Sequence, residues 1–168
     1  LIKIGSTKSL RSRAISLVDE FGAMRFIKVV ECEANGQCEN FMHRHEHISR
    51  LVQPALDRGQ WVLCDRFADS TTAYQGYAQN IDLETIATLY RLAVGNLEPN
   101  LTIILDLPVE VGLERAEERG IGATRYEKMG IEFHKRLRDG FLRIAANNPH
   151  RCSILDATQS IEEISEYI

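Results

Sequence analysis

The sequence predicts an α/β fold of three layers, α/β/α, with a five-stranded parallel sheet, and two observations lead to it. Short apolar runs that suit strands alternate along the 168 residues with longer segments whose apolar residues recur at helical spacing. Strands that alternate with helices pair mostly in parallel, and helices then cover both faces of the sheet. The expected strands are residues 1–4, 26–30, 61–64, 102–107 and 152–156.

The expected helices connect these strands. Residues 10–21 place Leu10, Leu17 and Phe21 on one helical face, and Gly22 stands where a helix often ends. In the next helix, residues 40–56, Pro54 lies near enough to the end to be tolerated. Further helices are expected over residues 83–92, 109–119, 127–146 and 161–168.

Length and composition indicate one domain, residues 1–168, in a protein of the ordinary soluble class. A net charge of −4 gives no general attraction to nucleic acid or to an anionic membrane, so neither is expected as a partner and any anion site must be local. We see no apolar run of membrane-spanning length and no signal-peptide pattern. The cysteines, Cys32, Cys38, Cys64 and Cys152, lack the spacing of a disulfide framework, so a cytoplasmic protein with reduced thiols is expected.

The segment from Asp65 to Tyr77 carries the densest chemistry, and it directly follows the apolar run at residues 61–64, which reads as a short buried strand. Open α/β folds bind ligands at the carboxyl ends of their strands. Asp65 is placed there to hold a metal or orient a nucleophile, and Arg66 to grip a phosphate bidentately. The side chains suited to the edge of a base are Ser70, Thr71, Tyr74 and Gln75.

A plainer interpretation of the same segment is a helix N-terminus capped by Asp69 or Ser70, with Arg66 in solvent. A zinc site at His43, His45 and His47 is disfavoured, because only the first and last of these share a helical face. The nearby cysteines do not help, since their C-x5-C spacing misses the compact zinc patterns.

The pattern D-R-[YF]-x-x-S-x-x-A-Y-Q of the thymidylate kinase family is met at every fixed position of this segment, so the chain resembles that family. The resemblance runs from about Phe41 to the end and includes residues 97–108, 125–127 and 133–142. It implies a P-loop kinase fold of the nucleoside-monophosphate type. It also implies transfer of the γ-phosphoryl of ATP to dTMP, giving dTDP, with Mg²⁺ bridging the phosphates, and a homodimer.

The resemblance implies a role for each candidate residue. Asp65 supports the metal or the acceptor, and Arg66 holds the phosphate of dTMP. Tyr74 packs where a ribose 2′-hydroxyl would intrude. The other residues expected to bind dTMP are Phe41, Arg44, Ser70, Thr71 and Gln75.

A lid is implied around residues 115–127, where glycines lie between arginines. In that lid Arg119 and Arg125 stabilise the transferring phosphoryl group, whose charge needs cations around its oxygens. The alternative is that Arg115 and Arg119 are solvated cations at a helix carboxyl end.

The loop Gly5-Ser6-Thr7-Lys8-Ser9 is expected to bind ATP, with Ser9 also on Mg²⁺. It ends in the Lys-Ser of a phosphate loop but is shorter than G-x-x-x-x-G-K-[ST], so a plain turn capped by Ser6 or Thr7 is the alternative. The turn after the second strand is short as well. Either both loops are short in the protein, or residues are missing from the sequence at these two points, and we favour the second.

Two other functions stay open at this point. One is a catalytically impaired nucleotide-binding module of the same fold, in which the short loops are real. The other is a kinase for another deoxynucleoside monophosphate.

Overall fold

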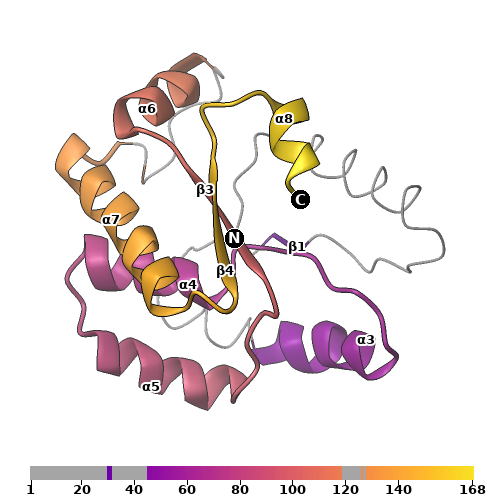
Figure 1. Ribbon diagram of the computed structural model, residues 1–168. Helices are drawn as coiled ribbons and strands as arrows, with labels where there is room; N and C mark the ends of the chain where they lie inside the picture. Colours follow the sequence, from indigo (N-terminus) through magenta and orange to yellow (C-terminus); the bar gives the residue numbers. More distant parts are fainter. Residues whose placement is uncertain (1–29, 32–44, 119–125, 127) are drawn as a thin grey trace. The chain divides into compact units, whose positions relative to one another are not determined.

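The computed structural model describes residues 30–31, 45–118, 126 and 128–168 (Figure 1). They fall into two compact units. The first contains the described residues up to Ala68 together with Ala87–Glu98, and the second contains Asp69–Ile86 together with Pro99–Ile168. The expected strand 1–4 and helix 10–21 lie outside the described residues, as does most of the strand 26–30.

In the first unit, β1 (Val30–Glu31) pairs in parallel with β2 (Cys64–Asp65), with Val30 opposite Cys64 and Glu31 opposite Asp65. Parallel strands need a long crossover, and helical residues provide it here. Its helix contains η1 (Ile48–Val52), a π-helical turn, and α3 (Gln53–Asp57). The π turn ends at Val52, two residues before Pro54, whose nitrogen has no hydrogen to donate to a carbonyl.

The core of the first unit lies between this crossover and the end of α5 (Leu83–Val94). Ile48, Val52 and Phe67 are buried there, and Tyr90 packs against them while its hydroxyl donates to the carbonyl of Leu97. The prediction that residues 61–64 form a buried strand is wrong for the first residue, Trp61. The Trp61 side chain is 62% exposed, and the β2 ladder begins only at Cys64.

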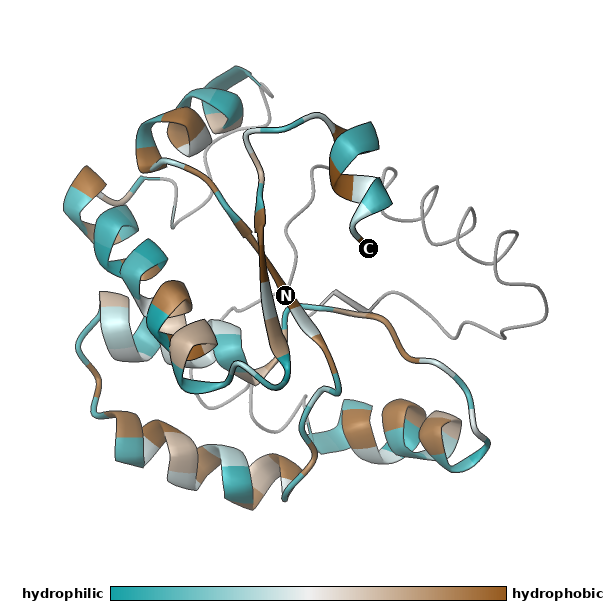
Figure 2. Ribbon diagram, viewed as in Figure 1, coloured by the Kyte–Doolittle hydropathy of each residue, from teal (hydrophilic) through white to brown (hydrophobic). Residues whose placement is uncertain are grey.

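In the second unit, β3 (Thr102–Asp106) pairs in parallel with β4 (Cys152–Asp156) along their full lengths, from Thr102 opposite Cys152 to Asp106 opposite Asp156. The strands are apolar along much of their length, whereas α7 (Ile131–Asn147) alternates apolar and polar residues (Figure 2). This amphipathic helix lays its apolar face on both strands and on η2 (Thr72–Ala78), also π-helical. The buried residues of this core are Ala73, Ala78, Phe133, Leu137 and Ile144.

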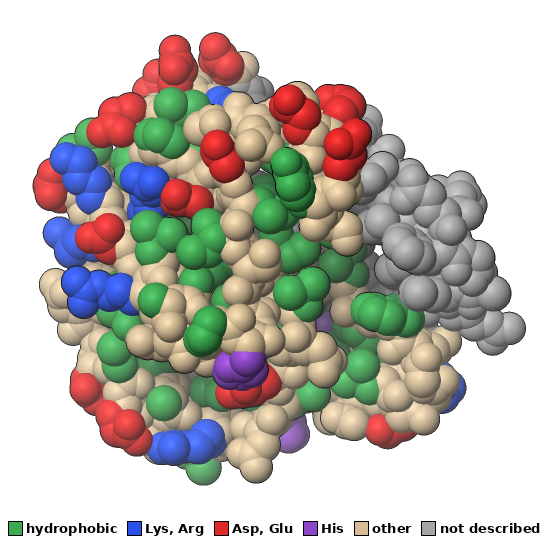
Figure 3. Space-filling view, in the orientation of Figure 1, with side chains coloured by type: hydrophobic (Ala, Val, Ile, Leu, Met, Phe, Trp, Pro, Cys, Tyr) green, Lys and Arg blue, Asp and Glu red, His purple; other side chains and the backbone are tan. Residues whose placement is uncertain are grey.

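The second unit also contains α4 (Ala68–Thr71) apart from its first residue, α6 (Val109–Glu118) and α8 (Ile161–Glu166), and α4 continues into η2. On the face seen in Figure 3, acidic side chains gather over α6 and α8, and those of both signs alternate over α7. The described residues on that face therefore form no continuous basic patch.

Both described strand pairs are parallel, as predicted, and helices alternate with them. The described residues form two separate pairs of strands, so the five-stranded sheet stays a prediction. The single domain also stays a prediction. Cys64 and Cys152 are partly buried free thiols, as expected, and burial raises the pKa of the Cys152 thiol. Among the described helices, none has the length and apolar character needed to cross a lipid bilayer.

Candidate functional site

The carboxyl end of β2 holds two of the predicted site residues, Asp65 and Arg66, both partly buried. Arg66 has a φ of +66°, a left-handed conformation that is uncommon for a residue with a side chain. The Cys64 thiol donates to the Arg66 carbonyl at 3.3 Å. The next residue, Phe67, is buried with its ring edge-to-face on Tyr90, at a centroid distance of 6.0 Å. The strand end is therefore anchored by Phe67, and unusual backbone at such a point is typical of functional sites.

Asp65 fits a magnesium site by its chemistry and its place. Mg²⁺ prefers oxygen ligands, and in phosphate-transfer sites one or two protein groups suffice because substrate phosphates and water supply the rest. A carboxylate at the end of a parallel strand meets that need. The described part of the chain contains no group of three or more His, Cys, Asp or Glu that could hold a metal by themselves. The second predicted ligand, Ser9, lies outside it.

The four residues predicted to read a base stand on one continuous helix, formed by α4 and η2. Residues four apart on a helix share a face, which pairs Ser70 with Tyr74 and Thr71 with Gln75. Ser70 is buried, and the other three are partly buried. The helix widens into a π turn at Thr72, and such turns recur at functional sites. The plainer interpretation is correct that a helix begins in this segment, but its N-cap is wrong, because α4 begins at Ala68 and both Asp69 and Ser70 lie inside it.

Tyr126 touches two of these four residues. Its ring meets that of Tyr74 edge-on at a centroid distance of 4.8 Å and stacks on Phe133 at 6.0 Å. The Gln75 amide donates from Nε2 to the Tyr126 hydroxyl at 3.3 Å. Sequence reasoning gave Tyr126 no role of its own, although an aromatic residue directly after the predicted lid arginine, Arg125, was a usable signal.

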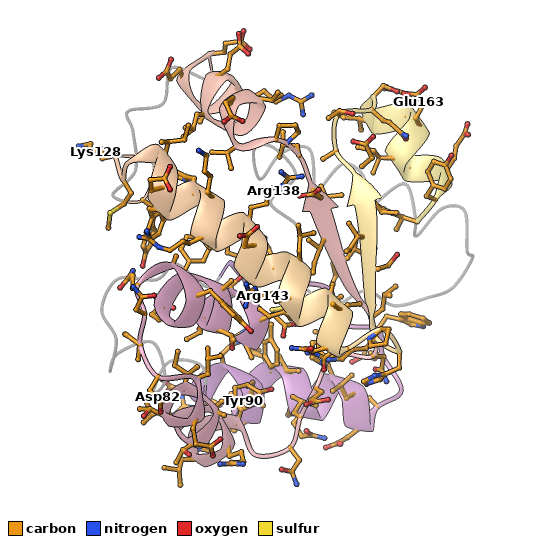
Figure 4. All side chains as sticks on the ribbon, turned by 60° about the vertical axis from the view of Figure 1, so that its left-hand side comes forward. Asp82, Tyr90, Lys128, Arg138, Arg143 and Glu163 are labelled. Atoms are coloured by element: carbon orange, nitrogen blue, oxygen red, sulfur yellow. The ribbon has the colours of Figure 1, made fainter. Side chains whose placement is uncertain are left out.

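Two carboxylates of the second unit form ion pairs with arginines. Asp106 ends β3 and accepts from Nε and Nη2 of Arg138 at 2.7 and 2.8 Å, and Arg138 extends from α7 (Figure 4). The hydrogen bond to Asp106 raises the pKa of Arg138. Asp69 accepts from Arg151 in the same two-pronged way. These contacts support assigning Asp106 to the fold.

Most of the predicted lid and the predicted ATP loop lie outside the described residues. Of the predicted lid, Arg115 lies in α6 and donates to the carbonyl of Ala157 at 2.9 Å. Lying outside the described residues are Gly5, Ser6, Thr7, Lys8, Ser9, Phe41, Arg44, Arg119 and Arg125.

Known proteins of other organisms are similar to this chain. The thymidylate kinase of Bradyrhizobium sp. (strain ORS 278) is 50% identical over 127 residues, which cover 74% of this chain and 56% of that protein. The thymidylate kinase of Caulobacter vibrioides is 50% identical over 125 residues, covering 74% and 60%. The chain thus spans little more than half the length of these relatives.

A solved structure agrees with these relatives. The crystal structure of thymidylate kinase from Ehrlichia chaffeensis matches with a TM-score of 0.67 and 28% identity, covering 92% of this chain and 87% of that one. This likeness supports the predicted α/β fold of the nucleoside-monophosphate-kinase type. The family model for thymidylate kinase matches residues 40–168. This match covers well over half of the residues of the chain. The chain therefore belongs to the thymidylate kinase family.

Proposed function

We propose that the protein transfers the γ-phosphoryl group of ATP to dTMP and releases dTDP and ADP. The observation that carries this proposal is the Asp65–Tyr77 segment. It meets the family's pattern at every fixed position, its Asp-Arg pair follows a parallel strand, and its hydroxyls and amide share one helix.

Phosphoryl transfer asks the protein mainly to position the two substrates in line and to supply charge against the phosphate oxygens. In this proposal the Arg66 guanidinium binds the dTMP phosphate through two parallel hydrogen bonds. Phe67, the next residue, is buried against Tyr90 and anchors the strand end from which the Arg66 side chain extends. The lid arginines, Arg119 and Arg125, bind the oxygens of the group in transfer.

The thymine base is read by the α4–η2 helix. Gln75 can offer both a donor and an acceptor to the thymine edge, with Ser70, Thr71 and Arg44 as further partners. Tyr74 closes the sugar side, and Phe41 lies against the base. A site built from hydrogen bonds rejects analogues that leave its polar groups unpaired.

The donor side of the proposal uses Gly5, Ser6, Thr7, Lys8 and Ser9 for the ATP phosphates, with Mg²⁺ held by Ser9 and Asp65. When bound, the metal neutralises charge on the donor phosphates. Asp65 holds its carboxylate at the strand end, where it can orient either that metal or the acceptor oxygen. The homodimer and the cytoplasmic location stay predictions.

Calorimetric titration with single nucleotides tests the acceptor. We expect dTMP to bind more tightly than dCMP or dGMP, because those bases leave the amide of Gln75 mispaired. Equal affinity for the three monophosphates would contradict the base-reading assignment. Binding of dTMP without any turnover would instead favour the nucleotide-binding module over the kinase.

A further inference from the structure

A buried polar cluster lies at the start of the helix that carries the proposed base-reading residues. It consists of Asp69, Thr102 and Arg151, which are 7%, 3% and 9% exposed, and we refer to it as the anchor cluster. Arg151 donates from Nη1 to Asp69 Oδ2 at 2.7 Å and from Nη2 to Oδ1 at 2.9 Å. The Thr102 hydroxyl donates to Asp69 Oδ2 at 3.3 Å and lies 3.2 Å from Arg151 Nη1.

The anchor cluster joins three elements that are far apart in the sequence. Asp69 lies in the first turn of α4, Thr102 is the first residue of β3, and Arg151 directly precedes β4. The backbone N–H of Thr102 also donates to the carbonyl of Arg151, at 2.7 Å. The helix is thereby fixed at one point to the amino end of the β3–β4 pair.

Stability alone is a weak reason for such a cluster. Burying two charges has a desolvation cost that a hydrophobic pair of similar volume avoids, so buried ion pairs are often replaceable without loss of stability. A two-pronged arginine–carboxylate pair does fix direction and distance, which an apolar contact does not. The cluster therefore holds the helix in one place and one orientation.

The position of this helix matters because the helix contains the proposed base-reading residues. Ser70 is the neighbour of Asp69, and Gln75 lies six residues beyond Asp69 on the same continuous helix. Near that second point the Tyr126 hydroxyl accepts from Gln75, so the segment is held on both sides of Tyr74. A base-reading site needs such support, since catalytic and binding groups lose efficiency when displaced by about 1 Å.

We infer that Asp69 and Arg151 are positioning residues for the dTMP site, acting through Ser70, Tyr74 and Gln75 rather than by touching the substrate. This inference rests on the proposed function. It predicts that weakening the pair changes the affinity for dTMP while leaving the ATP site as it is.

The test is steady-state kinetics of the full-length protein with the substitutions Asp69→Asn and Arg151→Lys. We expect Asp69→Asn to raise KM for dTMP about tenfold, with KM for ATP within about twofold of the wild type, because only the base-reading helix shifts. Arg151→Lys keeps the buried charges balanced but loses the fork, so it should fold and raise KM for dTMP by an intermediate factor. Glu132→Gln in the exposed Glu132–Lys135 pair is the matched control and should change neither constant.

A purely structural role gives a different result. Partial unfolding lowers the concentration of active enzyme and hence the maximal velocity, but it leaves KM unchanged. The inference is overturned if KM for dTMP is unchanged in both variants. It is also overturned if KM for dTMP and KM for ATP rise by the same factor. If Asp69→Asn does not fold, the result for Arg151→Lys decides between these outcomes. If the wild type shows no dTMP-dependent turnover, the proposed function fails as well, so the two failures are distinguishable.

Discussion

The backbone of Gly140 in α7 lies against the ring of Tyr77 in η2 so closely that residue 140 has no room for a side chain. A Cβ atom built there would lie 2.7 Å from Tyr77 Cβ and 2.9 Å from its Cγ. Alanine normally stabilises a helix relative to glycine. We nevertheless expect Gly140→Ala to destabilise the protein by about 1–3 kcal/mol, because overpacking outweighs that gain. Urea unfolding followed by circular dichroism measures it.

Gly112 in α6 provides the matched control. A Cβ atom at residue 112 would meet Leu107 Cδ2 at 3.8 Å, which is an ordinary contact. Gly112→Ala should therefore stabilise the protein by about 0.5–1 kcal/mol. A Gly140→Ala variant that gains as much as Gly112→Ala would show that α7 and η2 do not approach this closely.

The Arg138–Asp106 pair is bidentate and only partly exposed, at 40% and 23% of the two side chains. Charge-assisted hydrogen bonds in such a place are worth more than a solvated pair, so we expect Arg138→Gln to cost about 1–2 kcal/mol of unfolding free energy. Lys135→Gln, which breaks the more exposed pair with Glu132, should cost well under about 1 kcal/mol. Equal costs for the two substitutions would contradict the special strength assigned to the Asp106 pair.

The capping box at the start of α8 should make stability depend on pH through Glu163. Its carboxylate accepts from the backbone N–H and the hydroxyl of Ser160 at 2.9 and 2.7 Å, and these hydrogen bonds lower the pKa of Glu163. The stabilisation is therefore complete above the ordinary pKa of 4.5 and is lost as pH falls through the lowered value. Glu163→Gln should flatten the acid limb of a plot of unfolding free energy against pH. Glu162→Gln removes the same charge one residue away and should leave that limb in place.

Arg66 is the residue on which the proposed acceptor site depends most. Arg66→Ala should remove the phosphate grip and raise the transition-state free energy by about 2–4 kcal/mol, seen as a fall in kcat/KM for dTMP. Arg66→Lys should restore only part of the loss, because an ammonium group cannot reproduce the fork. Unchanged kcat/KM in Arg66→Ala would mean that the Asp-Arg motif has been misassigned.

Elements with a strong local pattern could be predicted from the sequence. The strand at residues 152–156 has its predicted bounds, and the helix after Pro108 begins at Val109 as expected. Boundaries shifted where the pattern is weak. The long helix predicted from residue 127 begins at Ile131, with Gly130 as its N-cap.

The sequence indicates a helix at residues 68–78 only as the plainer alternative, and its extent could not be predicted, for a physical reason. This stretch contains adjacent threonines and a glycine, which are poor helix formers, and its polar side chains indicate a ligand site rather than a particular secondary structure. Packing of Ala73 and Ala78 against α7 outweighs these preferences. The partner of Asp69 could not be predicted either, because Arg151 lies 82 residues away and no local pattern links the two.

The proposed kinase activity is tested most directly by ADP release from ATP and Mg²⁺, measured with and without each deoxynucleoside monophosphate. We expect one ADP for each dTMP consumed, at a rate on the order of 1–100 per second, and much slower release with dCMP or dGMP. An intact-mass measurement on the same sample establishes the length of the chain that was assayed. ADP release that dTMP does not accelerate, or that dCMP and dGMP accelerate equally, would contradict the proposed phosphorylation of dTMP.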